Sequence, residues 1–183
     1  HKVVKGETIT QIAQKYNLKV IYDGAHSFGV NYNGKSIFEY GDISTCSFHA
    51  TKLFHTVEGG AVFTKKPDLL KQMALLMNFG HITPYEFGPA GVNGKNSEFH
   101  AAMGLVNLRH IHTILKKRGE LSDYYRKKIK YLDVKYLKIR EGTEYNNPYF
   151  PILFENEKNR CQRGLGMMVS KNWGKLFFCA EKR

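Results

Sequence analysis

The sequence predicts an α/β fold with a mostly parallel sheet, and three observations support this prediction. A helix-forming segment, residues 8–16, precedes a short apolar run that ends in Asp23. A helix followed by a fully apolar strand is typical of an α/β unit with a buried parallel sheet. Two further β-rich runs, residues 43–48 and 60–64, follow in the chain, and a helix is expected directly after the second. The length of 183 residues suits one domain or two small ones.

The predicted helices have recognisable starts and apolar stripes. Thr8 is a candidate N-cap of the first helix. Pro67 suits a first helical turn, so we expect a helix from Pro67 through Met77. The side chains of this helix that we expect to point inward are Leu69, Leu70, Met73 and Leu76. Ser97 is expected to cap a third helix, and residues 121–131 to form a fourth. The apolar stripe of the third helix consists of Phe99, Ala102, Met103 and Val106.

The C-terminal part of the chain changes character. Residues 134–139 and 149–154 have the pattern of strands, which we expect to pair antiparallel in a separate unit. Residues 156–183 have no clean period and contain seven Lys or Arg against two Asp or Glu. We interpret this last segment as a divergent basic tail, with a short basic helix or strand as the alternative.

Composition narrows the classes of partner. The chain has 28 Lys and Arg against 16 Asp and Glu, which favours an anionic ligand. Basic and aromatic side chains do not alternate as on a nucleic-acid surface, so a nucleic-acid-binding domain is an alternative that depends on net charge alone. No apolar run approaches the ~18 residues of a membrane helix, and we expect no membrane partner. The three cysteines, Cys46, Cys161 and Cys179, form no C-x-x-C pair, which favours a reducing, cytoplasmic location.

The segment from Gly29 to Ser36 matches the pattern G-x-x-x-x-G-K-S of a phosphate-binding loop. Such a loop needs a helix directly after it, because the helix N-terminus binds the phosphates. Residues 37–42 have no helical period and include Gly41. A turn between two strands therefore explains these glycines better than a nucleotide triphosphatase does.

The histidines do not predict a metal site. His110 and His112 are two residues apart, so on a helix they face different directions. His26 and His49 do not have the spacing of zinc ligands.

A carboxylate and an amine are expected to meet at one edge of the predicted sheet. Asp23 ends one buried strand, and Lys52 follows the next strand on a polar turn. The carboxyl ends of strands in an open α/β sheet border the ligand crevice. Such a pair suits pyridoxal 5'-phosphate (PLP): the amine forms a Schiff base and the carboxylate keeps the pyridine nitrogen protonated. Taken singly, Asp23 could be a turn cap, Lys52 a surface cation and Ser47 a strand hydroxyl.

Four phrases in order resemble the DegT/DnrJ/StrS-type sugar aminotransferases, which are PLP enzymes of the aspartate aminotransferase fold (fold type I). Residues 22–26 (Tyr-Asp-Gly-Ala-His) resemble the family's strand-Asp phrase. Residues 47–52 and the Glu-Gly-Gly at 58–60 resemble its Ser-Phe-x-x-x-Lys phrase. Residues 78–81 resemble its Asn-Phe-Gly phrase, and residues 93–102 its Asn-x-Arg-x-Ser-Glu phrase. The resemblance covers about residues 8–155.

The resemblance implies a role for each matching residue. It implies that Lys52 forms the Schiff base with the cofactor and moves a proton between substrate and cofactor. Asp23 is implied to pair with the pyridine N–H, and Ala25 to pack on one face of the ring. His26, where many members have Gln, is implied to lie near the 3-hydroxyl oxygen.

Two further residues are implied to bind the phosphate. Ser47 would bind it within one subunit. Asn93 would reach the cofactor phosphate of a neighbouring subunit, because the family builds its sites across a homodimer interface. Lys95 stands where Arg is common in the family.

The resemblance also implies a domain organisation and an activity. Residues 1–115 are expected to be part of the PLP-binding large domain, and residues 116–155 the start of a small α+β domain. Since family members are about twice as long, we expect parts to be missing at both ends. The implied reaction moves an amino group from an amino acid, glutamate being expected, to a keto group of a nucleotide-linked sugar for polysaccharide synthesis. A catalytically inactive remnant, acting only as a structural or interaction domain, is the alternative.

Overall fold

A computed structural model describes residues 6–154 and 179–181 of the chain. These residues belong to two compact units, each of which is described by itself. Unit 1 comprises residues 1–28 and 34–108, and unit 2 comprises residues 29–33 and 109–183. The assignment of residues 1–115 to a large domain and 116–155 to a small one stays a prediction.

Unit 1 contains a small sheet with helices before and after it. Its elements are α1 (Ile9–Lys15), β1 (Ile21–Asp23), β3 (Lys35–Ser36), the 3-10 helix η1 (Ile37–Glu39), β4 (Ile43–Ser47), β5 (Gly60–Phe63), α2 (Pro67–Met77), β6 (His81–Thr83), β7 (Glu86–Phe87) and α3 (Glu98–Arg109). The predicted start of each of its helices is confirmed. Thr8 and Gln11 form a capping box, Pro67 occupies the first turn of α2, and the Ser97 hydroxyl accepts from the His100 N–H at 3.4 Å.

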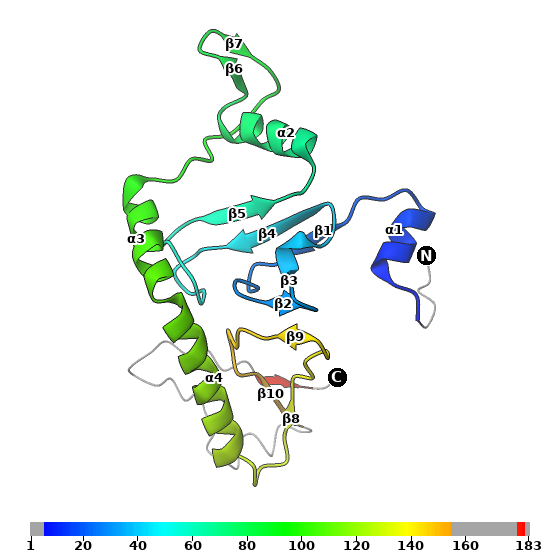
Figure 1. Cartoon of the computed structure of the whole chain (residues 1–183), viewed down its shortest axis with the longest axis vertical. Coiled ribbons are helices and arrows are strands. Elements are labelled where there is room, and N and C mark those ends of the chain that lie inside the picture. The colour runs from blue at the N-terminus through cyan, green and yellow to red at the C-terminus, as the bar shows by residue number, and fades with distance from the viewer. Residues whose placement is uncertain (1–5, 155–178, 182–183) are drawn as a thin grey trace. The chain divides into compact units, whose positions relative to one another are not determined.

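The sheet of unit 1 has the strand order β1-β4-β5 (Figure 1). β1 and β4 run parallel, with Ile21 opposite Ile43 and Asp23 opposite Thr45. β5 pairs antiparallel with β4, and Ser47 lies opposite Gly60. The parallel pair expected from the sequence is therefore present, and the third strand makes the sheet mixed.

An aromatic cluster packs beneath the loop that leaves β4. Phe28 stacks on Phe54 with a centroid separation of 4.2 Å, and Phe48 meets Phe54 edge-on at 5.0 Å. Leu53 and Phe54 are buried, and Cys46 is buried within β4. Burial of this apolar surface holds the loop against the body of unit 1.

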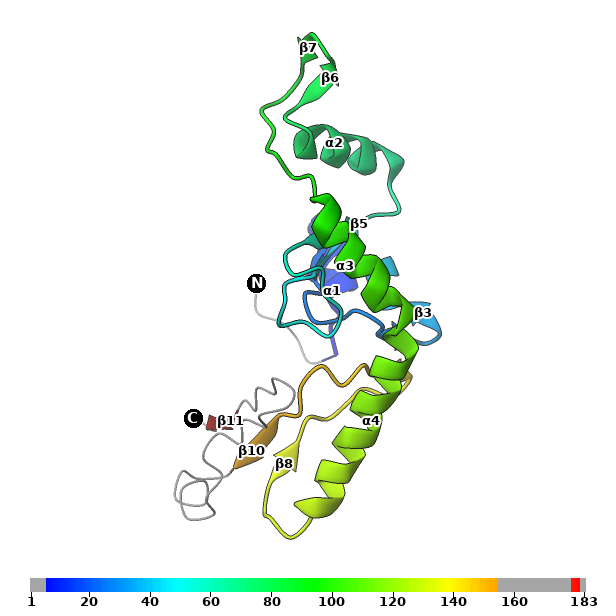
Figure 2. The same cartoon turned by 90° about the vertical axis from the view of Figure 1, so that its left-hand side faces the viewer.

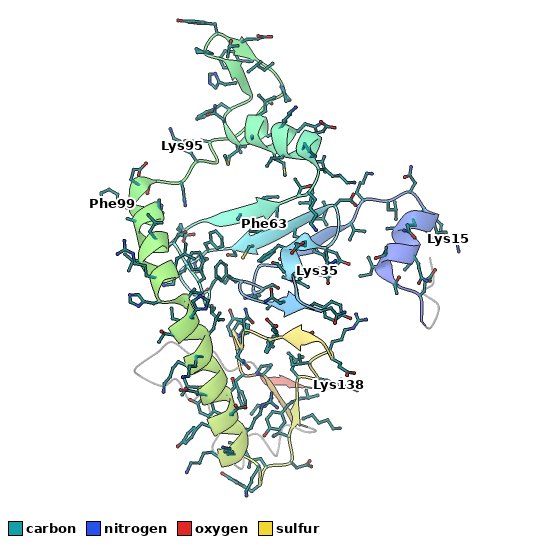
Figure 3. The ribbon with its side chains drawn as sticks, in the orientation of Figure 1. Lys15, Lys35, Phe63, Lys95, Phe99 and Lys138 are labelled. Carbon is teal, nitrogen blue, oxygen red and sulfur yellow. The ribbon has the colours of Figure 1, made fainter. Side chains whose placement is uncertain are left out.

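The predicted apolar face of α2 is buried only in part, and that of α3 is exposed. In α2, Leu70 is 55% exposed and Leu76 is also exposed, whereas Leu69 and Met73 are half-buried. In α3 the expected stripe faces outward, since Phe99 is 89% exposed and its side chain projects away from the helix in Figure 3. The sequence period places the apolar residues of α3 on one face of the helix, but a face is buried only where neighbouring elements pack against it. In α3 that face carries Gly104, the buried residue of the helix.

Unit 2 combines one long helix with short strands. Its elements are β2 (Asn31–Tyr32), α4 (Ile111–Lys128), β8 (Lys135–Tyr136), β9 (Thr143–Glu144), β10 (Ile152–Phe154) and β11 (Cys179–Glu181). β8 and β10 pair antiparallel, as the sequence predicts, while β10 and β11 pair parallel. Apart from the backbone of β11, the predicted basic tail, residues 156–183, lies outside the described residues.

The helix of unit 2 begins ten residues earlier than the sequence predicts. α4 begins at Ile111 instead of residue 121, because Ile111 is buried and the Lys, Arg and Leu residues after it favour helix. α4 lies beside β8 in both ribbon views (Figure 2), with the Arg126 guanidinium 4.8 Å from the centroid of the Tyr136 ring.

The second glycine of the Gly29–Ser36 segment, Gly34, belongs to a turn between two strands, and Gly29 lies in a separate turn before β2. Asn33 and Gly34 connect β2 to β3 with φ angles of 49° and 72°. Two successive positive φ values are typical of a tight strand-to-strand turn, and Asn-Gly is its preferred sequence. The prediction of a turn in place of a phosphate-binding loop is confirmed.

Asp42 connects three segments of unit 1, and we predict that it makes stability depend on acid pH. Its carboxylate accepts from the Val20 N–H at 2.8 Å and pairs with Lys66. The hydrogen bond from Lys66, followed by that from Val20, lowers the pKa of Asp42. A lowered pKa contributes stability above the unfolded value of about 3.9, and this contribution is lost as the pH falls through the folded value.

Thermal unfolding between pH 7 and pH 3 tests this prediction. The variant Asp42→Asn should have a lower Tm than the wild type at pH 7. The difference should shrink below about pH 4, where the wild-type carboxylate becomes protonated. Asp123→Asn, an exposed carboxylate on α4, is the control and should run parallel to the wild type. Parallel curves for Asp42→Asn would contradict the prediction.

Candidate functional site

The parallel pairing of β1 and β4 places two predicted site residues at the same edge of the sheet. Asp23 is the last residue of β1, and Ser47 is the last residue of β4. The loop over residues 48–59 leaves this edge, carries Lys52, and returns as β5. The structure thus brings the strand-end carboxylate and the lysine loop to one place, as expected for a ligand crevice in an α/β sheet.

His26 interacts with both charged groups, Asp23 and Lys52. The Lys52 Nζ is 3.3 Å from His26 Nε2 and 3.4 Å from His26 Nδ1. Lys52 Nζ is therefore within hydrogen-bonding distance of both ring nitrogens. Burial and the charge of Lys52 lower the pKa of His26, while Asp23 raises it. Asp23, His26 and Lys52 are therefore close enough to interact electrostatically.

The Asp23 carboxylate is held by its own turn. Its Oδ1 accepts from the Ala25 N–H at 3.0 Å. The Gly24 N–H donates to the Thr45 carbonyl at 2.9 Å, which continues the β1–β4 ladder by one residue. A Cβ at Gly24 would lie 2.8 Å from both the Thr45 carbonyl oxygen and the Phe38 ring. Glycine is therefore required here, since no side chain fits at this close approach.

The Lys52 loop is closed by backbone hydrogen bonds. The Phe48 N–H donates to the Gly59 carbonyl at 2.8 Å, and the Thr56 N–H donates to the Phe48 carbonyl at 2.9 Å. Ser47 Oγ accepts from the His49 N–H at 3.3 Å, and the Lys52 N–H donates to the His49 carbonyl at 2.9 Å. These bonds give the turn before Lys52 a defined shape.

Val57 shows that the loop is held in a costly conformation. Its φ is 70°, in the left-handed region that β-branched residues rarely adopt. On one side of it, the Thr56 hydroxyl donates to the Glu58 carbonyl at 2.6 Å. Strain of this kind persists only where surrounding contacts determine the backbone, and it is frequent at functional sites.

Asn93 is positioned by a different segment from the one that carries Lys52. It lies on the segment between β7 and α3 and forms a bridge with Asn78, the residue after α2. Lys95 lies on the same segment (Figure 3). Among the described contacts, none joins Asn93 to Asp23, His26 or Lys52. Its predicted role in a neighbouring subunit's site stays a prediction.

Sequence patterns missed several residues that shape the site. His49, to which no role was assigned, lies with Nδ1 2.9 Å from Thr51 Oγ1 and Nε2 3.7 Å from Glu58 Oε1. Asn107 of α3 donates from Nδ2 to the His55 carbonyl at 2.8 Å. Single polar residues of this kind have no spacing that distinguishes them from surface residues.

The local chemistry at the edge fits PLP. Schiff-base formation with the PLP aldehyde requires a primary amine, and Lys52 has one. Stabilisation of the protonated pyridine nitrogen requires a carboxylate, and Asp23 has one. The Cys46 thiol does not compete as a nucleophile, because burial raises its pKa to about 11. Among the described residues, no cluster of three or more His, Cys, Asp or Glu could hold a metal ion. Within the same residues, no helix is long and apolar enough to span a bilayer.

Known proteins resemble the chain over most of its length. The sequence model of the DegT/DnrJ/EryC1/StrS aminotransferase family matches residues 2–172. A dTDP-4-amino-4,6-dideoxy-D-glucose transaminase of Shigella dysenteriae is 44% identical over 152 residues, which cover 82% of this chain and 41% of that protein. The chain thus spans about two fifths of the length of this curated relative.

Solved structures confirm the predicted aspartate-aminotransferase-like α/β fold. PseC of Helicobacter pylori, an aminotransferase involved in pseudoaminic acid biosynthesis, matches with a TM-score of 0.75 and 27% identity over 89% of this chain and 45% of PseC. DesI, crystallised in the presence of its TDP-sugar product, matches with a TM-score of 0.72 and 31% identity over 78% of this chain and 36% of DesI. With the family match over residues 2–172, these findings lead to one conclusion. The chain belongs to the DegT/DnrJ/EryC1/StrS aminotransferase family.

Proposed function

We propose that the chain carries the lysine half-site of a PLP-dependent aminotransferase. The reaction moves an amino group from an amino acid, glutamate being expected, to a keto group of a nucleotide-linked sugar. One observation carries the proposal: Lys52 Nζ lies 3.3 Å from His26 at the strand edge that also presents Asp23. The dTDP-sugar named for the Shigella relative and the TDP-sugar product of DesI support this substrate class.

Bound PLP supplies an aldehyde that captures amines and a ring that withdraws electrons from the attached carbon. Lys52 would hold the cofactor through its Nζ and, once released, would use the same nitrogen to move a proton between the substrate carbon and the cofactor carbon. The Asp23 carboxylate would keep a proton on the pyridine nitrogen, because a neighbouring anion favours the charged form of the ring. The Asp23–Ala25 hydrogen bond keeps this carboxylate directed from the strand end.

The remaining predicted residues orient the cofactor. Ala25 is small enough to pack against one face of the ring. His26, which faces Lys52, would contact the 3-hydroxyl oxygen next to the carbon that Lys52 attacks. The Ser47 hydroxyl would donate to the phosphate, and Asn93 would do so across a homodimer interface. We assign the protein to the cytoplasm, with a role in polysaccharide biosynthesis.

The first test is covalent capture of the cofactor by Lys52. Incubation of the whole chain with PLP, followed by borohydride reduction and peptide mapping, should yield a phosphopyridoxyl group on Lys52. Reduction makes the nitrogen–carbon link a stable secondary amine, so the readout does not depend on turnover. The variant Lys52→Ala should lose the adduct from this peptide.

Lys95→Ala is the matched control, because Lys95 is an exposed lysine of the same unit. This variant should keep the Lys52 adduct at the wild-type yield. If the folded wild type carries no adduct on Lys52, the proposal fails and the chain is an inactive remnant of the family.

The second test separates cofactor capture from electron withdrawal by the ring. Asp23→Asn retains an oxygen that can accept from the Ala25 N–H, so the turn should persist. Its Lys52 adduct should therefore form with a yield similar to that of the wild type. Amino-group transfer from glutamate should fall by about 10²-fold or more, because the neutral amide cannot hold the ring proton.

Release of 2-oxoglutarate in a single turnover measures this transfer. Asp68→Asn, which removes a carboxylate in the first turn of α2, is the control and should transfer at the wild-type rate. An Asp23→Asn variant that transfers as fast as the wild type would exclude the proposed role of the carboxylate.

A further inference from the structure

Helix α3 meets the Lys52 loop at a glycine. Gly104 is the buried residue of α3, and a Cβ built on it would lie 2.9 Å from the Thr56 Cγ2. The Phe54 ring atom Cζ would lie 3.8 Å from the same Cβ. The helix backbone thus approaches Thr56 more closely than any residue with a side chain would allow. Figure 1 shows α3 at the end of the sheet where β4 ends and β5 begins.

Thr56 cannot move away from α3 without losing its own bonds. It is 5% exposed, and its hydroxyl donates to the Glu58 carbonyl at 2.6 Å. Its N–H donates to the Phe48 carbonyl at 2.9 Å. A Cβ at Gly59 would collide with the Thr56 hydroxyl oxygen, so the loop surrounds this side chain on the other side as well. Thr56 is therefore fixed between the loop and the helix.

A second contact one helical turn further reinforces the first. Asn107 donates from Nδ2 to the His55 carbonyl at 2.8 Å. Gly104 and Asn107 are three residues apart, so they lie on the same face of α3. One face of α3 therefore contacts two consecutive residues, His55 and Thr56, three and four positions after Lys52.

These contacts control the loop that carries Lys52. The Thr56 N–H is bonded to Phe48, the first residue after β4, and this bond closes the segment that contains Lys52. Phe54, between Lys52 and Thr56, is stacked on Phe28. A displacement of Thr56 would therefore shift the backbone at Lys52 and move Nζ relative to His26.

We propose that Gly104 and Thr56 are positioning residues that let α3 set the reach of Lys52 toward the cofactor. The inference rests on the proposed function of Lys52 and deepens it. It predicts that adding one methyl group to α3, far along the chain from the lysine, impairs capture of PLP.

The test compares two glycine-to-alanine variants on helices. Gly104→Ala places its Cβ against Thr56, whereas Gly119→Ala on α4 is the matched control, with Asn147 Nδ2 at 4.0 Å as the nearest atom. Both gain the same helix propensity. At subsaturating PLP, the borohydride-trapped Lys52 adduct should fall about tenfold in Gly104→Ala, since small misplacements of a reacting group have large effects on rate. It should stay unchanged in Gly119→Ala.

Rescue distinguishes positioning from general damage. Thr56→Ser removes the methyl group that meets position 104 and keeps the hydroxyl bonded to Glu58. The double variant Gly104→Ala with Thr56→Ser should therefore recover the adduct yield of Thr56→Ser alone. A Gly104→Ala variant that captures PLP like the wild type, or a double variant that shows no recovery, would overturn the proposal.

Two further measurements keep the test decisive. If Gly104→Ala does not fold, the variant Thr56→Val takes its place in the test. Valine cannot form the hydrogen bond to the Glu58 carbonyl, so the adduct yield should be about fivefold lower than in Thr56→Ser. Equal yields in the two variants would overturn the proposal. Amide hydrogen exchange without cofactor reports the docking by itself. The Thr56 amide should exchange faster in Gly104→Ala than in Gly119→Ala, and equal exchange would refute the docking of α3 on the loop. This readout does not depend on the Lys52 adduct. A wild type that forms no adduct would refute only the proposed function.

Discussion

The parallel pairing of β1 with β4 is the constraint on which the site depends. With Asp23 opposite Thr45, the carboxylate is level with the last residues of β4, and the chain beyond Ser47 must begin its loop at the same edge. A slip of one residue would turn Asp23 to the other face of the sheet. The Gly24 N–H bond to Thr45 secures this register at the point where the carboxylate is presented.

The lysine needs a second constraint, because it lies on a loop and not on a strand. Backbone hydrogen bonds connect the two ends of that loop, and the loop strains the backbone at Val57, which adopts a left-handed conformation. The packing of Phe54 with Phe28 and Phe48, together with the contact with α3, compensates for the strain at Val57. The Lys52 amine therefore extends from a segment whose backbone is held by the sheet edge, by the aromatic cluster and by helix α3.

Features encoded locally could be predicted from the sequence. Pro67 and the candidate N-cap Thr8 identify helix starts, and the places of Asp23 and Lys52 after two predicted strands were enough to expect them at one edge. Features that depend on tertiary packing could not be predicted. The stripe through Phe99 has the right period and yet is exposed, because α3 meets its neighbours through Gly104. Glycine inside a helix lowers helix stability, so the sequence alone gives no reason for Gly104. The structure gives one, because Thr56 approaches the helix backbone too closely for a Cβ at this position.

The electrostatics of the cluster follow from the same geometry. Burial disfavours a positive charge on the imidazole, and the nearby Lys52 disfavours it further, so both lower the pKa of His26, whereas Asp23 raises it. The imidazole beside the lysine therefore loses its proton more readily than a free histidine side chain does. Because the buried Cys46 thiol of β4 stays protonated, it would not compete with Lys52, the nucleophile that we propose for this edge. A shift of the loop that moved Nζ away from His26 would remove the Lys52–His26 interaction and would also displace the amine from the edge of the sheet. The hydrogen bonds and packing that fix the loop backbone prevent such a shift.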